Sequence, residues 1–113
     1  MSVIYKIVSH EAWDEAVAQG RFVGAAIDLK DGYIHFSTAA QAQQTAALHF
    51  HGQAGLVVVA FEAGQLGAGL KWEPSRGGQL FPHLYGPLDP ALALGFTDIT
   101  LDPDGVPQLS LPA

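Results

Sequence analysis

The chain has 113 residues, of which almost half are hydrophobic and only 14% are charged, and it contains no cysteine. This predicts a single domain over residues 1–113 with a core that needs no disulfides, and it excludes thiol nucleophiles and zinc–thiolate sites. The formal net charge of −6 argues against non-specific nucleic-acid binding and against anionic membranes. No apolar run reaches the ~18–20 residues of a membrane helix. With no recognisable signal peptide, we expect a cytoplasmic protein.

The N-terminal segment alternates strand and helix signals. Residues 3–8, V-I-Y-K-I-V, are β-branched and aromatic and predict a strand. Ser9 is a suitable N-cap for a helix over residues 10–19, and Gly20 ends it.

A second strand and helix follow the turn signal Asp31-Gly32. Residues 33–37 alternate strictly, which puts Tyr33, His35 and Ser37 on one face of a strand and the two apolar residues between them on the other. Thr38 opens a capping-box pattern, T-A-A-Q, that starts a helix over residues 39–51.

The remaining strands complete a small sheet. The continuous apolar run 56–61, L-V-V-V-A-F, predicts a central buried strand. Asp89-Pro90 can start a short helix through Leu94, and a turn at 102–105 joins predicted strands at 97–101 and 106–111. The pattern indicates an α+β fold with a mostly antiparallel sheet and two main helices.

Residues 72–87, W-E-P-S-R-G-G-Q-L-F-P-H-L-Y-G-P, gather polar side chains on a backbone constrained by glycine and proline. If residues 80–85 are extended, His83 and Tyr85 share a face. We expect Glu73, before Pro74, in a turn. Two roles remain open for Glu73: an acid or base whose pKa is raised beside Trp72, or an ion-pair partner of Arg76. Gly77-Gly78 would let a ligand or another strand approach closely.

The polar face of residues 33–37 is the other candidate site. An imidazole at His35 and hydroxyls at Ser37 and Thr38, beside a helix start, suit a polar ligand. The alternative is a core histidine bonded to a carbonyl, with Thr38 only capping the helix. His35 and His83 could meet around a metal with a carboxylate, but no spacing requires it, and we expect no metal.

Three motifs carry a family resemblance: I-Y-K-I at 4–7, D-G-Y-I-H-F-S-T-A at 31–39, and W-E-P-S-R-G-G-Q-L-F-P-H-L-Y-G-P-L at 72–88. They resemble the bacterial family filed as domain of unknown function 952 over roughly residues 3–95. That family has been grouped by remote similarity with the ADP-ribosyltransferase-like fold, a split β-sheet that clasps NAD in a central cleft. The resemblance therefore implies NAD as the ligand.

The resemblance also implies roles for single residues. His35 would orient a ribose hydroxyl, Tyr85 or Trp72 would stack on the nicotinamide, and Arg76 would hold the pyrophosphate. The late-strand glutamate of ADP-ribosyltransferases has no clean counterpart, which leaves His83 or Glu73 as acid or base.

Three functional hypotheses follow. The first is binding of NAD or an ADP-ribose-like nucleotide, with transfer or removal of the ADP-ribosyl group. The second is a non-catalytic module for a small metabolite or a partner protein. The third is a nucleotide-independent hydrolase or isomerase that uses His83 and Glu73. The sequence leaves the oligomeric state open.

Overall fold

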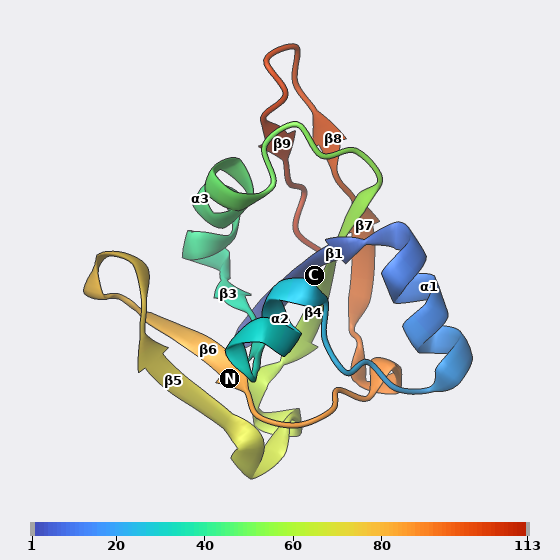
Figure 1. Cartoon of the computed structure of the whole chain (residues 1–113), viewed down its shortest axis with the longest axis vertical. Coiled ribbons are helices and arrows are strands. Elements are labelled where there is room, and N and C mark those ends of the chain that lie inside the picture. The colour runs from blue at the N-terminus through green and yellow to red at the C-terminus, as the bar shows by residue number, and fades with distance from the viewer. Residues whose placement is uncertain (1, 113) are drawn as a thin grey trace.

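The computed structural model describes residues 2–112 as helices and antiparallel strands arranged in separate sheets (Figure 1). The described helices are α1 (His10–Gln19), α2 (Ala26–Asp31) and α3 (Ala39–His49), with short 3-10 turns at Ala63–Gln65, Gly67–Gly69, Arg76–Gly78 and Pro90–Leu92. The strands are β1 (Val3–Ser9), β2 (Ile34–His35), β3 (Ser37–Thr38), β4 (Leu56–Glu62), β5 (Leu70–Pro74), β6 (Leu80–Leu84), β7 (Gly95–Asp98), β8 (Thr100–Leu101) and β9 (Pro107–Gln108). The predicted α+β class is confirmed; the ADP-ribosyltransferase-like assignment stays a prediction.

The continuous apolar run predicted as a central strand is β4, which lies between β1 and β7 in a sheet of order β3-β1-β4-β7. Because side chains alternate along a strand, β4 contributes residues to two hydrophobic cores, one on each face of the sheet. Val57, Val59 and Phe61 join the cluster that contains Trp13 of α1. Leu56, Val58 and Ala60 join the cluster that contains Ala46 of α3. Burial on both faces explains why β4 is apolar at every position but its last.

The two longer helices begin where their caps predict. Ser9 Oγ accepts the N–H of Ala12 at 3.1 Å at the start of α1. At the start of α3, Gln41 Oε1 accepts the N–H of Thr38 at 3.1 Å, which is the reciprocal bond of a capping box. Helix α3 ends at His49, two residues before its predicted end. Helix α2 was not predicted.

The predicted strand 33–37 is divided between two sheets. Ser37 pairs with Tyr5 of β1, whereas His35 pairs with His83 of β6, and the N–H of Phe36 donates to Pro82 O at 3.0 Å. The predicted alternation is retained, because Ile34 and Phe36 are both buried in the α1-side core. This switch separates the four-stranded sheet from the second sheet, β2-β6-β5.

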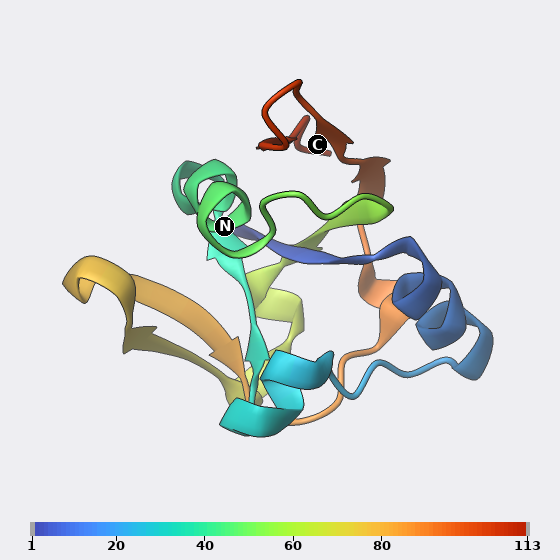
Figure 2. The ribbon, with the colours of Figure 1, turned by 45° about the horizontal axis from the view of Figure 1, so that its top comes forward.

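The segment 70–84 forms a hairpin, β5–β6, so the expectation that Glu73 lies in a turn is wrong. Glu73 is a strand residue paired with Phe81, and Pro74 takes the last position of the edge strand, where it is tolerated. The hairpin reverses at Gly77 and Gly78, whose φ angles of 67° and 76° are left-handed. A Cβ at either glycine would meet nothing within 4 Å, so both serve the turn rather than a close approach. The hairpin and α3 lie on the same side of the molecule, opposite α1 (Figure 2).

The C-terminal elements are shorter than predicted. The helix after Asp89 is the single 3-10 turn Pro90–Leu92, and the two predicted strands become β7, β8 and β9. Among the described helices, none is long and apolar enough to cross a membrane.

The burial of Phe61 predicts how much stability its removal would cost. Its ring is fully buried and packs edge-on against Trp13 and Phe36, with ring centroids 6.1 and 5.9 Å away. Phe61→Ala should lower the free energy of unfolding by about 3–5 kcal/mol, because it leaves a cavity. Phe96→Ala is the matched control, because Phe96 is half exposed. Urea denaturation of both variants checks this; equal losses would contradict the assignment of the core.

Candidate functional site

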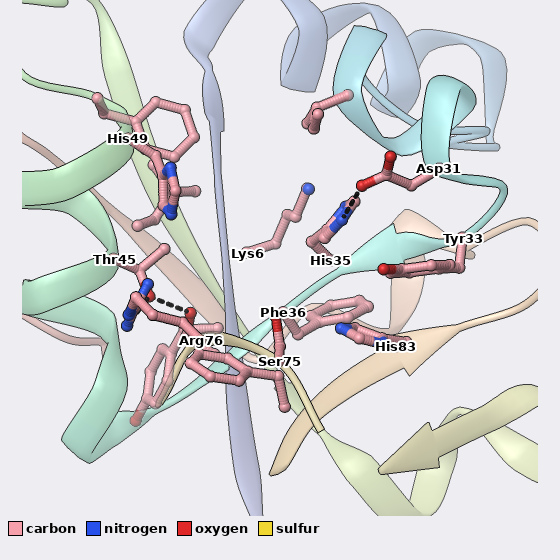
Figure 3. A pocket seen from close by; sticks show the side chains of 16 residues that line it. Lys6, Asp31, Tyr33, His35, Phe36, Thr45, His49, Ser75, Arg76 and His83 are labelled. Carbon is pink, nitrogen blue, oxygen red and sulfur yellow. Dashed lines mark hydrogen bonds and ion pairs between the residues drawn. The ribbon is translucent and has the colours of Figure 1, made fainter. Parts of the chain in front are cut away.

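A cavity of about 290 Å³ lies where the two sheets separate, between β1, α2, α3 and the β5–β6 hairpin (Figure 3). Strand β3 pairs with β1 only at Ile4 and Tyr5, so within the described residues no strand pairs with that edge of β1 from Lys6 onward. The cavity is lined by Tyr5, Lys6, Ile7, Ile27, Asp31, Tyr33, His35, Phe36, Ser37, Thr45, His49, Phe50, Ser75, Arg76, Phe81 and His83.

His35 is held between two carboxylates. Its Nδ1 lies 2.6 Å from Asp28 Oδ1, and its Nε2 lies 2.9 Å from Asp31 Oδ2. Because ionised carboxylates only accept, both contacts are hydrogen bonds at once only when each ring nitrogen carries a proton. His35 therefore has neither ring nitrogen free to act as a base while both contacts hold.

Asp28 is the buried centre of this group. Lys6 Nζ contacts both of its oxygens, at 3.0 Å to Oδ1 and 2.9 Å to Oδ2. Burial alone would raise the pKa of Asp28, but the His35 hydrogen bond and the Lys6 charge outweigh it and lower this pKa to about 2. Burial lowers the pKa of Lys6, and the charge of Asp28 only partly offsets this effect.

His83 has a different environment from His35. Its Nδ1 lies 2.8 Å from Glu73 Oε1, and the hydroxyl of Tyr85 donates to the same oxygen at 2.7 Å. The hydrogen bond from Tyr85, and to a smaller extent the one from His83, lower the pKa of Glu73. The same bond to Glu73 raises the pKa of Tyr85 to about 12. An ionised Glu73 can only accept, so His83 carries its proton on Nδ1.

The second ring nitrogen of His83, Nε2, forms no hydrogen bond within residues 2–112. No fully buried side-chain nitrogen or oxygen in this range lacks a partner, so Nε2 retains an accessible surface. His83 lines the cavity although its side chain is only 4% exposed, and we infer that Nε2 is the nitrogen that a bound ligand would reach. An imidazole oriented by a carboxylate, with one nitrogen free, is the arrangement of a general base.

Tyr33 joins the two histidines into one aromatic cluster. Its ring stacks on His83 with centroids 4.0 Å apart and lies 4.6 Å from His35 and 5.3 Å from Tyr85. The two imidazoles are 5.6 Å apart. The histidines therefore do meet, although in the described residues no three metal-ligating side chains are grouped to hold an ion.

Arg76 lies on the opposite side of the cavity from Asp31 and His35 (Figure 3). Its Nη2 donates to Thr45 Oγ1 at 3.2 Å, and its guanidinium carbon lies 5.0 Å from the centre of the Phe81 ring. Ser37 Oγ donates to the same threonine oxygen at 3.1 Å. Helix α3 thus positions the hairpin tip over the cavity.

The Glu73–Arg76 ion pair considered from the sequence is not formed. Within residues 2–112 no salt bridge joins the two, and Glu73 instead contacts His83 and Tyr85. Arg76 has only neutral partners on α3, so its charge is not balanced by a described carboxylate.

Two of the three sequence motifs, at 31–39 and 72–88, lie within a match to a protein-family model. Residues 7–94 match the family model described as "Protein of unknown function (DUF952)". The chain belongs to the DUF952 family. Comparison with curated proteins finds no match.

Solved structures of a relative share the fold. The crystal structure of protein CC0527 from Caulobacter crescentus is 58% identical over 95% of this chain and 94% of that chain, with a TM-score of 0.92. A solution NMR structure of CC0527 is also 58% identical, over 96% of this chain and 93% of that chain, with a TM-score of 0.85.

Most of the site residues predicted from the sequence converge in this DUF952 structure. The cavity lining includes His35, Ser37, Tyr33, Arg76 and His83. Glu73 and Tyr85 lie behind His83, in contact with it or with Tyr33.

Two predicted ligand contacts lie elsewhere. Trp72 is 41% exposed and pairs with Pro82, and neither residue lines the cavity. Thr38 starts α3 and is also outside the lining.

Sequence reasoning missed Lys6 and Asp28 as members of the site. Lys6 carried a signal, because it is a charged residue on the same face of an apolar strand as Ile4 and Val8. Asp28 carried none, because its partners are 22 and 7 residues away along the chain.

The depressed pKa of Asp28 predicts acid sensitivity. Its ordinary value of 3.8 falls to about 2 on folding, so the unfolded chain binds the proton more readily. The stability that this carboxylate contributes is complete above pH ~4 and is lost as pH falls toward ~2, a loss of about 2 kcal/mol. Denaturant unfolding across this range checks it.

Asp28→Asn separates this contribution from those of other carboxylates. The variant should lose about 3–5 kcal/mol at neutral pH, because Lys6 stays buried without its counter-charge, and its remaining acid sensitivity should be smaller. Asp14→Asn, which alters an exposed pair with His10, should change stability by less than about 1 kcal/mol. Equal pH dependence in wild type and Asp28→Asn would refute the assignment.

Proposed function

We propose that the cavity binds a nucleotide that carries ribose and phosphate, NAD or an ADP-ribose-like molecule. The observation that supports this most is convergence: His35 and Ser37 from residues 33–37 line the same cavity as Arg76 and His83 from residues 72–87. The family resemblance gives phosphate and acid–base roles to Arg76 and His83. It also gives His35 a ribose role, which requires the ligand to replace one of the two carboxylate contacts of that ring.

The charges of the cavity suit such a ligand. Lys6 and His35 are paired with carboxylates, whereas among residues 2–112 Arg76 has only the neutral partners Thr45 and Gln44. A guanidinium with free donors binds phosphate in a bidentate manner. We therefore assign the phosphate to the Arg76 side and the sugar to the side of His35 and Tyr33.

The size of the cavity limits the fit. About 290 Å³ lies at the lower end of the range for small-molecule pockets, roughly 300–1,000 Å³. The cavity suits one nucleoside half of a dinucleotide, and the other half would extend past the hairpin tip. Tyr33, which stacks on His83 inside the cavity, replaces Trp72 as the candidate aromatic contact, and Tyr85 lies behind it.

Calorimetric titration with ADP-ribose and NAD tests the proposal. Arg76→Ala should weaken binding by roughly 10- to 150-fold, since a hydrogen bond to a charged group contributes about 1.5–3 kcal/mol. The affinity of Arg76→Lys should be intermediate, because lysine keeps the positive charge but cannot make the bidentate contact of a guanidinium. The matched control is Arg21→Ala, which removes the chain's other arginine, outside the cavity. Absence of binding by wild type to both nucleotides would end the proposal.

The His83–Glu73 pair favours a catalytic role within the same function. Hydrolysis of an N-glycosidic bond joins a water oxygen to the ribose carbon while the departing base takes the bonding electrons. The water proton needs an acceptor, and Nε2 of His83 is the cavity nitrogen free to take it. Glu73 would hold the ring through Nδ1, and Tyr85 would hold Glu73.

Release of nicotinamide from NAD, followed by chromatography, tests this role. His83→Gln should reduce the rate by at least ~100-fold, as expected for loss of a general base, and should change nucleotide affinity much less. His51→Gln is the control, because His51 is exposed and outside the cavity. If wild type binds nucleotide without releasing nicotinamide, the protein is a binding module. Turnover of a small acid without nucleotide would favour the hydrolase or isomerase hypothesis.

A further inference from the structure

Lys6 occupies a position that an apolar residue would fill at lower cost. It lies on β1 between Ile4 and Val8, which are core residues on the same face, and its side chain is only 5% exposed. A buried ion pair is often no more stabilising than hydrophobic residues of similar volume. The amine is thus poorly explained by stability alone, and Lys6 lines the cavity.

Asp28 does not need Lys6 to satisfy its oxygens. Its Oδ2 accepts the N–H of Ala25 at 2.8 Å, and its Oδ1 accepts the N–H of His35 at 3.0 Å and faces the ring of His35 at 2.6 Å. Lys6, in turn, has no hydrogen-bond partner within residues 2–112 other than Asp28. An ammonium has three donors, so Lys6 keeps capacity toward a ligand.

We propose that Lys6 is a covalent carbonyl-binding site that forms a protonated imine with the open-chain aldehyde of an aldose phosphate. The proposal rests on the proposed function, which places the phosphate at Arg76 and the sugar near His35. In Figure 3, Lys6 lies between Arg76 on one side and His35 on the other. A sugar carbon therefore has the amine within the same cavity as its phosphate ligand.

The reaction balances without any further reagent. The ammonium gives a proton to a cavity water, and the amine nitrogen bonds to the aldehyde carbon while the carbonyl π electrons move to oxygen. The carbinolamine then recovers a proton and loses its oxygen as water. The net change is R–NH3⁺ plus aldehyde to R–NH⁺=CHR′ plus water, with no change of charge or oxidation state.

The surroundings of Lys6 favour both ends of this reaction. Burial lowers the pKa of Lys6 and so raises the fraction of free amine, the usual device of imine-forming lysines. The product is also a cation, and it remains beside Asp28 in place of the ammonium. The ion pair is thus preserved, whereas neutral adducts of Lys6 would leave Asp28 without its counter-charge.

Reductive trapping tests the proposal on the whole chain. Wild type is incubated at neutral pH with ribose 5-phosphate and cyanoborohydride, which reduces imines to stable amines, and the adducts are mapped by peptide mass spectrometry. Lys30 and Lys71, the other two lysines of the chain, are exposed internal controls. Lys6 should be modified at least ~10-fold faster than either, as an activated amine requires.

Parallel arms separate this proposal from nucleotide binding. Ribose should modify Lys6 more slowly than ribose 5-phosphate if Arg76 holds the phosphate. NAD, whose anomeric ribose carbons are all in glycosidic linkage and which carries no free aldehyde, should protect Lys6 if it shares the cavity. Preferential modification of Lys6 by the phosphate-free probe glycolaldehyde would support the imine site by itself. If neither the preference for phosphate nor the protection by nucleotide is seen, that result counts against the proposed function and not against the imine site.

Lys6→Arg, which keeps a cation beside Asp28, should abolish the adduct while circular dichroism and thermal unfolding stay close to wild type. If that variant does not fold, the modification rates of the three lysines in the wild-type protein still test the proposal. Modification of Lys6 no faster than Lys30 and Lys71 with all three probes would overturn the proposal, even if calorimetry shows nucleotide binding.

Discussion

The buried carboxylate of Asp28 is the interaction on which the site depends. It accepts hydrogen bonds from Ala25 at the start of α2, from the backbone and ring of His35 on β2, and from Lys6 on β1. One side chain thus ties a helix and strands from both sheets at the point where those sheets diverge. A carboxylate so buried is tolerable only when fully bonded, so the four donors and the cavity beside them form a single unit. The close approach is visible at Gly24, where an added Cβ would lie 2.8 Å from Asp28 Cβ.

The two cavity histidines show that residue type does not decide chemistry. They are directly paired across β2 and β6, and their ring centroids are 5.6 Å apart. His35 faces two carboxylates, one at each nitrogen, and is fixed by both. His83 faces one carboxylate, and its other nitrogen has no partner in the part of the chain that the structure describes. The number of acceptors around each ring therefore separates a positioning residue from a candidate base.

Local patterns predicted the frame of the fold, because periodicity and caps act over a few residues. The continuous run of β4, the cap at Ser9 and the alternation that puts Ile34 and Phe36 in the core are of this kind. Long-range choices were not predictable in the same way. Nothing near Phe36 says that the strand changes sheets there, and Pro74 favoured a turn although the edge of a sheet accepts proline. The partners of Glu73 and Asp28 also depend on which strands become neighbours.

The charge pattern across the cavity explains why one ligand should engage both halves of the site. On the β2 side, Lys6, Asp28, His35 and Asp31 form a chain of contacts in which the Lys6 amine and the His35 ring alternate with the two carboxylates. That group offers little net attraction to an anion, whereas Lys6 and Asp31, which both line the cavity, keep hydrogen-bonding capacity for a neutral polar group. On the α3 side, no carboxylate of the described residues compensates the charge of Arg76. A ligand with an anionic group at one end and hydroxyls or a carbonyl at the other matches this asymmetry, whereas a dianion with charge at both ends would meet Asp31 and be repelled. On electrostatic grounds, the proposed ligands, which carry phosphate beside a sugar, match this pattern better than dicarboxylic acids would.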